Sequence, residues 1–345
     1  MSSTIGNKLK ITLFGESHGA AIGCVIEGFP AGFVPNQEAV NAFMARRAPG
    51  ATPGSTARTE KDIPEILSGI CDGKTTGAPI TAIIRNTDAR SKDYSSLAIT
   101  PRPGHADYTL AVKTGGNNDI RGGGHSSGRI MAGLCYAGAL ALQYLNAKGI
   151  SVNGKIDTIG GIKISGDKDS YGLDEAARQR IQEARENCDS VGGTISCSIE
   201  GIPAGYGAPI FDGVENRLAA ILFGIPAVKG VEFGSGFYGS TLLGSQNNDP
   251  FSYKDGKVVT ESNNHGGSLG GITSGMPIEF RVAIKPTPSI SKTQQSVNLQ
   301  SRENTELVIK GRHDACIVPR ALPVVEAAAA LAALDLILDE QPAQR

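Results

Sequence analysis

The chain has 345 residues, of which 40% are hydrophobic and 19% charged, and its formal net charge is −1. This balance is typical of a soluble globular protein and excludes the basic excess with which proteins bind nucleic acid or anionic membranes. Six dispersed cysteines form no Cys-x-x-Cys pair, so we expect reduced thiols, a cytoplasmic location and no metal site. We expect neither a signal peptide nor a membrane helix, since the most apolar stretch, 323–338, is short and carries two acids.

Hydrophobic patterns and capping residues predict an alternation of strands and helices without a regular βα repeat, which favours an α+β fold over a doubly wound sheet. In chain order, the expected elements are strands 10–14 and 23–26, helix 37–47, strand 80–85, a helix from Ser126 or Ser127 to 146, helix 174–187, strand 194–199, helix 212–223, strand 278–284 and helix 323–339. Pro323 suits the first position of the last helix. The two Ala-rich helices carry few charges and should be buried on most sides.

Three matches recur in the same order in the two halves of the chain. Residues 24–33 share seven of ten positions with residues 197–206, and 76–80 resemble 274–278. An Arg/His motif then precedes an Ala-rich helix in each half. We therefore predict a single domain over 1–345, built as an internal duplication with pseudo-repeats of about 1–150 and 151–345 around a shared helical core.

All five histidines lie in short motifs rich in glycine, serine and charge. They are Gly-Glu-Ser-His18-Gly, Arg-Pro-Gly-His105-Ala-Asp, Arg-Gly-Gly-Gly-His125-Ser-Ser-Gly-Arg, Asn-Asn-His265-Gly-Gly and Gly-Arg-His313-Asp. Histidine titrates near neutral pH, and glycine lets a backbone approach a ligand closely. The pattern predicts proton chemistry on an anionic ligand, although a histidine that only bonds a turn carbonyl is the alternative for His18.

The motif 121–129 is the strongest anion-site pattern in the chain. Glycines, Ser126, Ser127 and flanking arginines converge on a helix N-terminus, whose unpaired N–H groups bind phosphate. It matches neither the Walker nor the dinucleotide pattern, which disfavours a nucleotide hydrolase. A capped helix after a flexible loop is the alternative.

Together the motifs closely resemble the chorismate synthase family over nearly the full length. The resemblance rests on Gly-Glu-Ser-His-Gly, Gly-Gly-x-Ser-Ser-Gly-Arg, Arg-His-Asp followed by Val325-Glu-Ala, and Lys285-Pro-Thr-Pro-Ser289. It implies a β-α-β sandwich, usually a homotetramer, and one reaction: 5-enolpyruvylshikimate-3-phosphate loses phosphate and a ring proton by anti-1,4-elimination to give chorismate. Reduced FMN is the implied cofactor.

The resemblance also implies roles for individual residues. His18 would protonate the departing phosphate, His105 would protonate or balance charge on the reduced flavin, and Asp314 would help flavin N5 take the substrate proton. Arg46, Arg47 and Arg129 would hold the substrate, and Arg47 would also serve the cofactor side. The implied FMN contacts are His125, Ser126, Ser127, Gln246, Asn247, Gly270, Lys285, Pro286, Thr287, Pro288, Ser289 and Arg312.

The chain departs from the family pattern at three places. His125 stands where arginine is usual, Met131 stands where a hydroxyl residue is usual, and 48–53 lacks two usual arginines, with Pro53 in place of one of them. One of the lost arginines belongs to the pair expected to contact NADPH. We therefore expect that FMN must be supplied already reduced.

Two other functions fit the residues less completely. A phosphohydrolase using His18, His313 and Asp314 would release phosphate from simple esters without flavin. A non-enzymatic anion- or flavin-binding module would keep the glycine loops and lack the proton donors.

Overall fold

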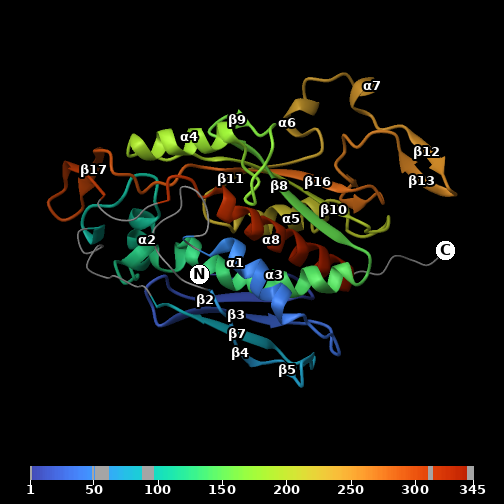
Figure 1. Ribbon diagram of the computed structural model, residues 1–345, viewed down its shortest axis with the longest axis horizontal. Coiled ribbons are helices and arrows are strands. Elements are labelled where there is room, and N and C mark those ends of the chain that lie inside the picture. The colour runs from blue at the N-terminus through green and yellow to red at the C-terminus, as the bar shows by residue number, and fades with distance from the viewer. Residues whose placement is uncertain (1, 49, 51–61, 88–96, 310–313, 340–345) are drawn as a thin grey trace.

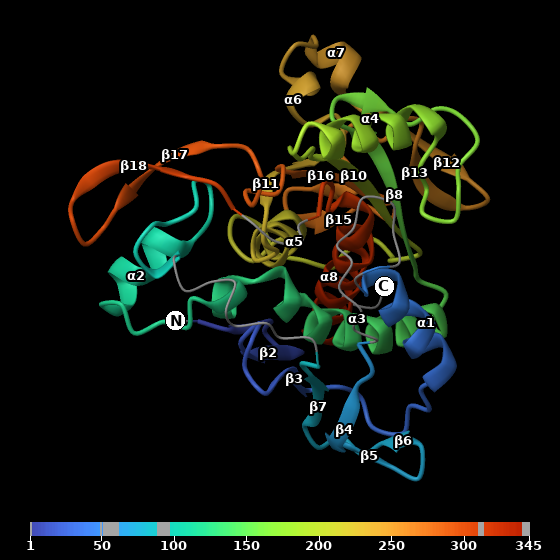
Figure 2. The same cartoon turned by 60° about the vertical axis from the view of Figure 1, so that its left-hand side comes forward.

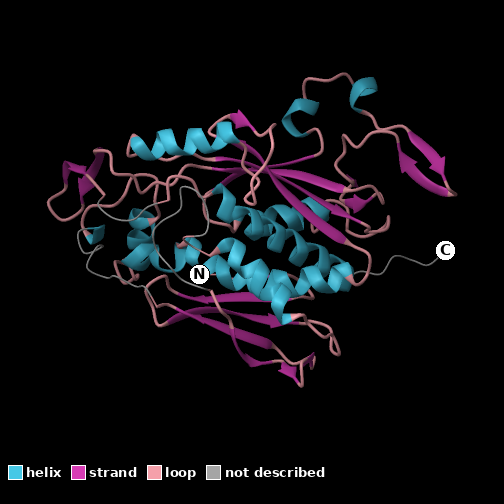
Figure 3. Cartoon of the chain, viewed as in Figure 1, coloured by secondary structure: helices cyan, strands magenta, loops and turns pink. Residues whose placement is uncertain are grey.

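The computed structural model describes residues 2–48, 50, 62–87, 97–309 and 314–339. A layer of helices lies between two five-stranded antiparallel sheets (Figure 1; Figure 3). The first sheet has the order β1 (Thr4–Ile5), β2 (Lys10–Gly15), β3 (Ala21–Glu27), β7 (Ile80–Arg85) and β4 (Glu65–Ser68). The second has the order β11 (Val228–Phe233), β16 (Ile278–Ile284), β10 (Gly193–Glu200), β8 (Ser151–Ile159) and β9 (Ile162–Lys163).

The inner layer contains the two Ala-rich helices. Its members are α1 (Gln37–Arg47), α3 (Met131–Asn146), α5 (Val214–Phe223) and α8 (Val318–Asp339). Outside it lie α2 (Asp107–Thr114), α4 (Glu175–Glu186), α6 (Gly236–Gly239), α7 (Gly244–Asn247) and the hairpins β5 (Ile70–Cys71)–β6 (Lys74–Thr75), β12 (Phe251–Lys254)–β13 (Lys257–Thr260), β14 (Ser268–Leu269)–β15 (Ile272–Thr273) and β17 (Gln294–Asn298)–β18 (Glu303–Leu307). Figure 2 shows the β17–β18 hairpin beside the segment that leads into α2, where the Leu299 amide donates to the Ile99 carbonyl at 2.9 Å.

The two sheets repeat one pattern of pairing. Ile26 of β3 lies opposite Ile80 of β7, and Ile199 of β10 lies opposite Ile278 of β16. These are the positions that the sequence matches align. A side-chain bond is repeated as well: the Thr75 hydroxyl donates to the Pro30 carbonyl at 2.6 Å, and the Thr273 hydroxyl to the Pro203 carbonyl at 2.7 Å.

The start of α8 differs from the sequence prediction. The helix begins at Val318 and contains Pro323 in its interior, so the prediction that Pro323 occupies the first position was wrong. Pro319 already lies in the first turn, where the missing N–H costs no helical bond. The Ala321 amide donates to the Ile317 carbonyl at 2.9 Å, which shows that helical bonding is established before Pro323.

α8 is long and apolar enough to cross a membrane by length and composition alone, but 78% of its most apolar window is buried inside the protein. The same buried character holds for α3, from Met131 to Ala141. Both helices are therefore core helices of the sandwich, as the sequence predicted.

The two core helices touch along a face of small residues. A Cβ placed on Gly138 of α3 would lie 2.3 Å from the Cβ of Ala327 on α8, closer than real Cβ atoms approach. Glycine at 138 is thus required for this helix spacing, despite its poor helix propensity.

Gly138→Ala is expected to lower the free energy of unfolding by about 2 kcal/mol, because overpacking at the helix contact outweighs the gain in helix propensity. Gly244→Ala is the matched control, since nothing lies within 4 Å of its added Cβ. Urea unfolding of both variants checks this, and equal stabilities would contradict the close contact.

Candidate active site

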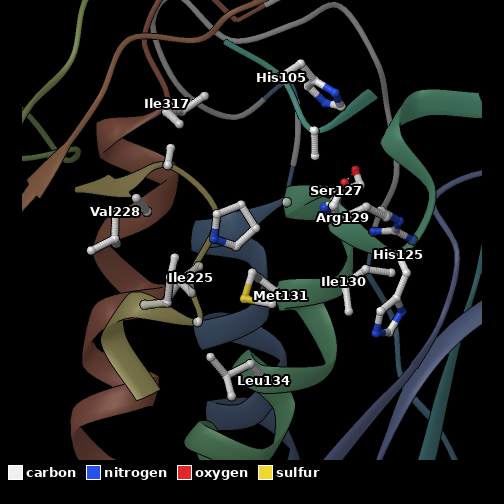
Figure 4. A pocket seen from close by; sticks show the side chains of 18 of the residues that line it. His105, His125, Ser127, Arg129, Ile130, Met131, Leu134, Ile225, Val228 and Ile317 are labelled. Carbon is white, nitrogen blue, oxygen red and sulfur yellow. Dashed lines mark hydrogen bonds between the residues drawn. The ribbon is translucent and has the colours of Figure 1, made fainter. Parts of the chain in front are cut away.

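A cavity of about 930 Å³ opens where the N-terminal ends of the two core helices meet the first sheet. Its lining comes from both halves of the chain, including 126–131 and Leu134 before and within α3, and 317, 320, 321 and 324 around the start of α8. Figure 4 shows His105, His125, Ser127 and Arg129 toward one side and apolar side chains such as Met131, Leu134, Ile225 and Val228 on the other. The cavity therefore combines a polar and an apolar wall.

The cavity brings together most of the residues that the sequence singled out. Those lining it are His18, Arg47, His105, His125, Ser126, Ser127, Arg129, Lys285, Thr287, Pro288, Ser289 and Asp314. The residues Arg46, Gln246, Asn247, Gly270 and Pro286 are described but do not line it. Arg312, His313 and Pro53 lie outside the described residues.

Two histidines face the same glycine loop from different segments. A Cβ on Gly122 would lie 2.4 Å from Nδ1 of His18, and one on Gly123 would lie 2.9 Å from Cε1 of His105. Both glycines have positive φ, 60° and 87°. The loop thus passes against both imidazole rings only because it carries no side chains there.

The glycine loop also changes how the helix begins. α3 starts at Met131, and two 3-10 turns, η2 (Arg121–Ser126) and η3 (Gly128–Ile130), come before it. The α-helix therefore begins later than the predicted start at Ser126 or Ser127, because Ser127 is extended and the turn that follows it, 128–130, is 3-10. Ser127 still caps a helical segment, accepting from the Arg129 amide at 3.3 Å.

His105 is held by a buried carboxylate. Its Nδ1 lies 2.6 Å from Oδ1 of Asp107, and Arg102 donates to both Asp107 oxygens at 2.7 and 2.8 Å. Burial on its own would raise the pKa of Asp107, but the bonds and charges of Arg102 and His105 lower it well below its usual range. Nη2 of Arg102 also lies 3.1 Å from Nδ1. The shorter contact, with an ionised Asp107 that only accepts, places the proton on Nδ1 and leaves Nε2 as the ring nitrogen that faces a ligand.

His125 uses both ring nitrogens within the fold. Nδ1 donates to the Gly15 carbonyl at 2.8 Å, and Nε2 lies 2.9 Å from the Ser3 hydroxyl. These bonds tie the glycine loop to the end of β2 and to the N-terminal segment. His125 thus lines the cavity and anchors its wall.

The two neighbouring arginines at the end of α1, Arg46 and Arg47, have different surroundings. Arg47 lines the cavity and its side chain is 3% exposed. Arg46 instead pairs with Glu326 of α8 at 2.6 Å and lies over the Phe43 ring. Arg129 joins Arg47 at the cavity wall, and both pair with Asp62, a residue that the sequence analysis did not single out.

Asp314 is fixed by a second residue that the sequence analysis missed. Nη1 of Arg320 donates to its Oδ2 at 2.7 Å, and Nε of Arg320 donates to the Arg47 carbonyl at 3.0 Å. Arg320 thus links the start of α8 to the end of α1. A motif search does not find it, because a single arginine six residues after an aspartate is unremarkable.

The Lys285 ammonium donates to the Gly104 carbonyl, which holds the 285–289 loop against the turn before His105. Burial, and then the charge of Lys229, lower the pKa of Lys285. Ser289 accepts from Nη1 of Arg102 at 3.1 Å.

Across the part of the chain that the structure describes, no group of three His, Cys, Asp or Glu side chains is placed to hold a metal ion.

Asp107→Asn is expected to reduce the free energy of unfolding by about 3 kcal/mol at pH 7, because it leaves Arg102 buried without its counter-charge. The lowered pKa of Asp107 means that its stabilising charge is present above the unfolded-state pKa of about 3.9 and is lost as the pH falls toward the folded-state value. The difference in free energy of unfolding between the unchanged protein and Asp107→Asn, measured by urea titration, should therefore become smaller below pH 4. A gap that is constant from pH 7 to pH 3 would argue against an ionised Asp107.

A family model described as chorismate synthase matches residues 9–338. The chain is 49% identical to the chorismate synthase of Lachnoclostridium phytofermentans, with 97% of this chain and 95% of the relative covered. It is 48% identical to that of Thermococcus gammatolerans, with 96% and 97% covered.

A crystal structure of chorismate synthase matches with a TM-score of 0.76 at 29% identity, and the match covers 97% of this chain and 93% of that chain. This likeness confirms the predicted α+β sandwich, and the family match confirms the resemblance that the motifs indicated. The chain therefore belongs to the chorismate synthase family.

Proposed function

We propose that the cavity is the place where the chain carries out the reaction of its family. That reaction is the anti-1,4-elimination of phosphate from 5-enolpyruvylshikimate-3-phosphate to give chorismate, a carbon–oxygen lyase step toward the aromatic amino acids. The observation that carries the assignment is the convergence of His18 and His105 on one glycine loop, in a cavity that Arg47, Arg129 and Asp314 also line.

The family uses reduced FMN, and the cavity fits this cofactor. Its volume of about 930 Å³ lies at the upper end of small-molecule sites. The apolar wall suits the flavin rings, and the polar wall suits the ribityl and phosphate groups. The polar candidates that line it are His125, Ser126, Ser127, Lys285, Thr287 and Ser289, with Pro288 beside them. When bound, reduced FMN supplies electron density to the substrate during the elimination.

The chain's own residues would bind the anionic groups of the substrate and transfer protons. Arg47 and Arg129 hold the anionic groups of the substrate, and His18 donates a proton to the departing phosphate, whose charge otherwise opposes its release. His105, oriented by Asp107, would balance charge on a bound cofactor. Asp314, held by Arg320, would help the cofactor to take the proton that the substrate loses.

Arg312 and Pro286 remain proposed cofactor contacts, the first outside the described residues and the second beside the cavity. Arg46 is a weaker substrate candidate, because its side chain is paired with Glu326.

Residues 1–345 are proposed to form one domain of two pseudo-repeats, about 1–150 and 151–345, which is supported by the repeated strand register.

We also propose a cytoplasmic homotetramer. The segment from α6 to β12 exposes large apolar side chains, a feature of interaction surfaces; they are Phe237, Tyr238, Leu243, Phe251 and Tyr253, each at least 66% exposed. Gln246, Asn247 and Gly270 do not line the chain's own cavity, so they would meet FMN only through such an assembly.

Purified protein is expected to form chorismate from 5-enolpyruvylshikimate-3-phosphate and chemically reduced FMN under anaerobic conditions. His18→Ala and His105→Ala should each lower turnover by about 100-fold or more, since each removes a proton-transfer group, while FMN binding persists. Chorismate absorbance and flavin fluorescence measure the two properties.

His265→Ala is the matched control for the loss of a buried imidazole. His265 bonds Asp249 and Ser274 and does not line the cavity, so its turnover should stay within a few-fold of the unchanged protein. Absence of chorismate with the unchanged protein would refute the lyase assignment, and full activity in both cavity variants would refute the roles of the two histidines.

Oxidised FMN with NADPH is expected to give no chorismate unless a separate flavin reductase is added, because 48–53 lacks two usual arginines, one of which belongs to the expected NADPH contact. The same anaerobic assay checks this. Chorismate formation from NADPH and oxidised FMN alone would show that the chain reduces its own flavin.

A further inference from the structure

A buried carboxylate lies behind the two arginines of the cavity wall. Oδ2 of Asp62 accepts from Nε of Arg47 at 2.8 Å and also from its Nη2, and Oδ1 accepts from Nη1 of Arg129. The Asp62 side chain is 0% exposed, whereas those of Arg47 and Arg129 are 3% and 5% exposed. Each carboxylate oxygen of Asp62 thus accepts hydrogen bonds from one guanidinium group.

The three groups occupy different depths of the wall. Arg47 and Arg129 line the cavity and Asp62 does not. The carboxylate therefore supports the arginines from behind and does not occupy the space that a ligand would fill. Arginine forks bind carboxylates in defined planes, so this shared anion fixes the spacing and the orientation of both guanidinium groups.

Further bonds restrain the same two arginines. Nε of Arg129 donates to Oδ1 of Asn86 at 3.0 Å, and the Arg47 carbonyl accepts from Arg320. Two guanidinium groups side by side repel each other and are costly to bury without an anion. One shared carboxylate offsets this repulsion.

The electrostatics keep this arrangement intact at neutral pH. Burial on its own would raise the pKa of Asp62, but the charges of Arg47 and Arg129, and the hydrogen bonds that they donate, lower it overall. The carboxylate is therefore ionised under the conditions in which the enzyme works.

We infer that Asp62 is a positioning residue of the substrate site, which sets Arg47 and Arg129 at the spacing that the phosphate and carboxylate groups of the substrate require. This inference rests on the proposed substrate role of the two arginines. Asp62 itself does not line the cavity.

Asp62→Asn tests the inference by removing the charge at nearly constant shape. The KM for 5-enolpyruvylshikimate-3-phosphate is expected to rise about 10- to 100-fold, because small misplacements of binding groups have effects of this size. The change in kcat should be smaller, and the Kd of FMN, measured by flavin fluorescence, should not change.

Asp335→Asn is the matched control. Asp335 is also a buried carboxylate; it accepts backbone amides at 7–9, pairs with Arg217 and does not line the cavity. The Asp335→Asn variant should lose thermal stability, as Asp62→Asn does, but its KM should equal that of the unchanged protein. A KM increase of the same size in both variants would mean that general destabilisation explains the effect, which would overturn the inference.

Asp62→Glu covers the case in which Asp62→Asn does not fold. It keeps the charge but moves the carboxylate by one methylene, and its KM is expected to rise about 10-fold. An unchanged KM in the variants that fold overturns the inference. A lower KM also overturns it, since that would show that Asp62 competes with the substrate for the arginines.

Arg129→Lys separates this inference from the proposed function. A raised KM in Arg129→Lys with an unchanged KM in Asp62→Asn would remove only the role of Asp62. An unchanged KM in Arg129→Lys, or no chorismate from the unchanged protein, would instead reject the assignment of the substrate site or of the reaction.

Discussion

The contact between α3 and α8 is the constraint on which the rest of the molecule depends. The helices meet at Gly138 and Ala327, at a distance that only small residues permit. Because both helices are buried between the sheets, their spacing sets the separation of the two halves. Their N-terminal ends then meet at one cavity, so the packing of two helices also determines where polar groups from distant segments come together.

Arginine–carboxylate pairs stabilise the polar wall of that cavity. Arg102 holds Asp107, Asp62 holds Arg47 and Arg129, and Arg320 holds Asp314. In each case a buried or half-buried charge has a counter-charge within hydrogen-bonding distance, which offsets the cost of removing it from water. The wall can therefore be rich in charged side chains.

The sequence alone predicted the elements with a clear hydrophobic period. Helix 37–47 and strands 80–85 and 278–284 have the predicted bounds. Strands β8 and β11 were missed, since polar residues and glycine interrupt their alternation. The starts of α3 and α8 were misplaced, because Ser and Pro are good but not decisive markers of a first turn when glycines or a second proline lie nearby.

The site was predicted in part, for a related reason. Motifs identified His18, His105 and Asp314, since unusual residues cluster in them. They could not distinguish Arg46 from Arg47, because adjacent helical residues point about 100° apart and the direction of the cavity is a property of the packed fold. Asp62 and Arg320 each contact a residue far away in the chain, Arg129 and Arg47 respectively, and no local pattern predicts such contacts.

The likeness of the two sheets does not extend to the connections between their strands. Strands β2 and β3 of the first half are joined by the short turn 16–20, which carries His18, whereas the matching strands β8 and β10 are joined by residues 160–192, which contain β9 and α4. The second sheet thus has a helical connection where the first sheet has the histidine turn. The two sheets therefore contribute differently to the cavity, although its lining comes from both halves of the chain.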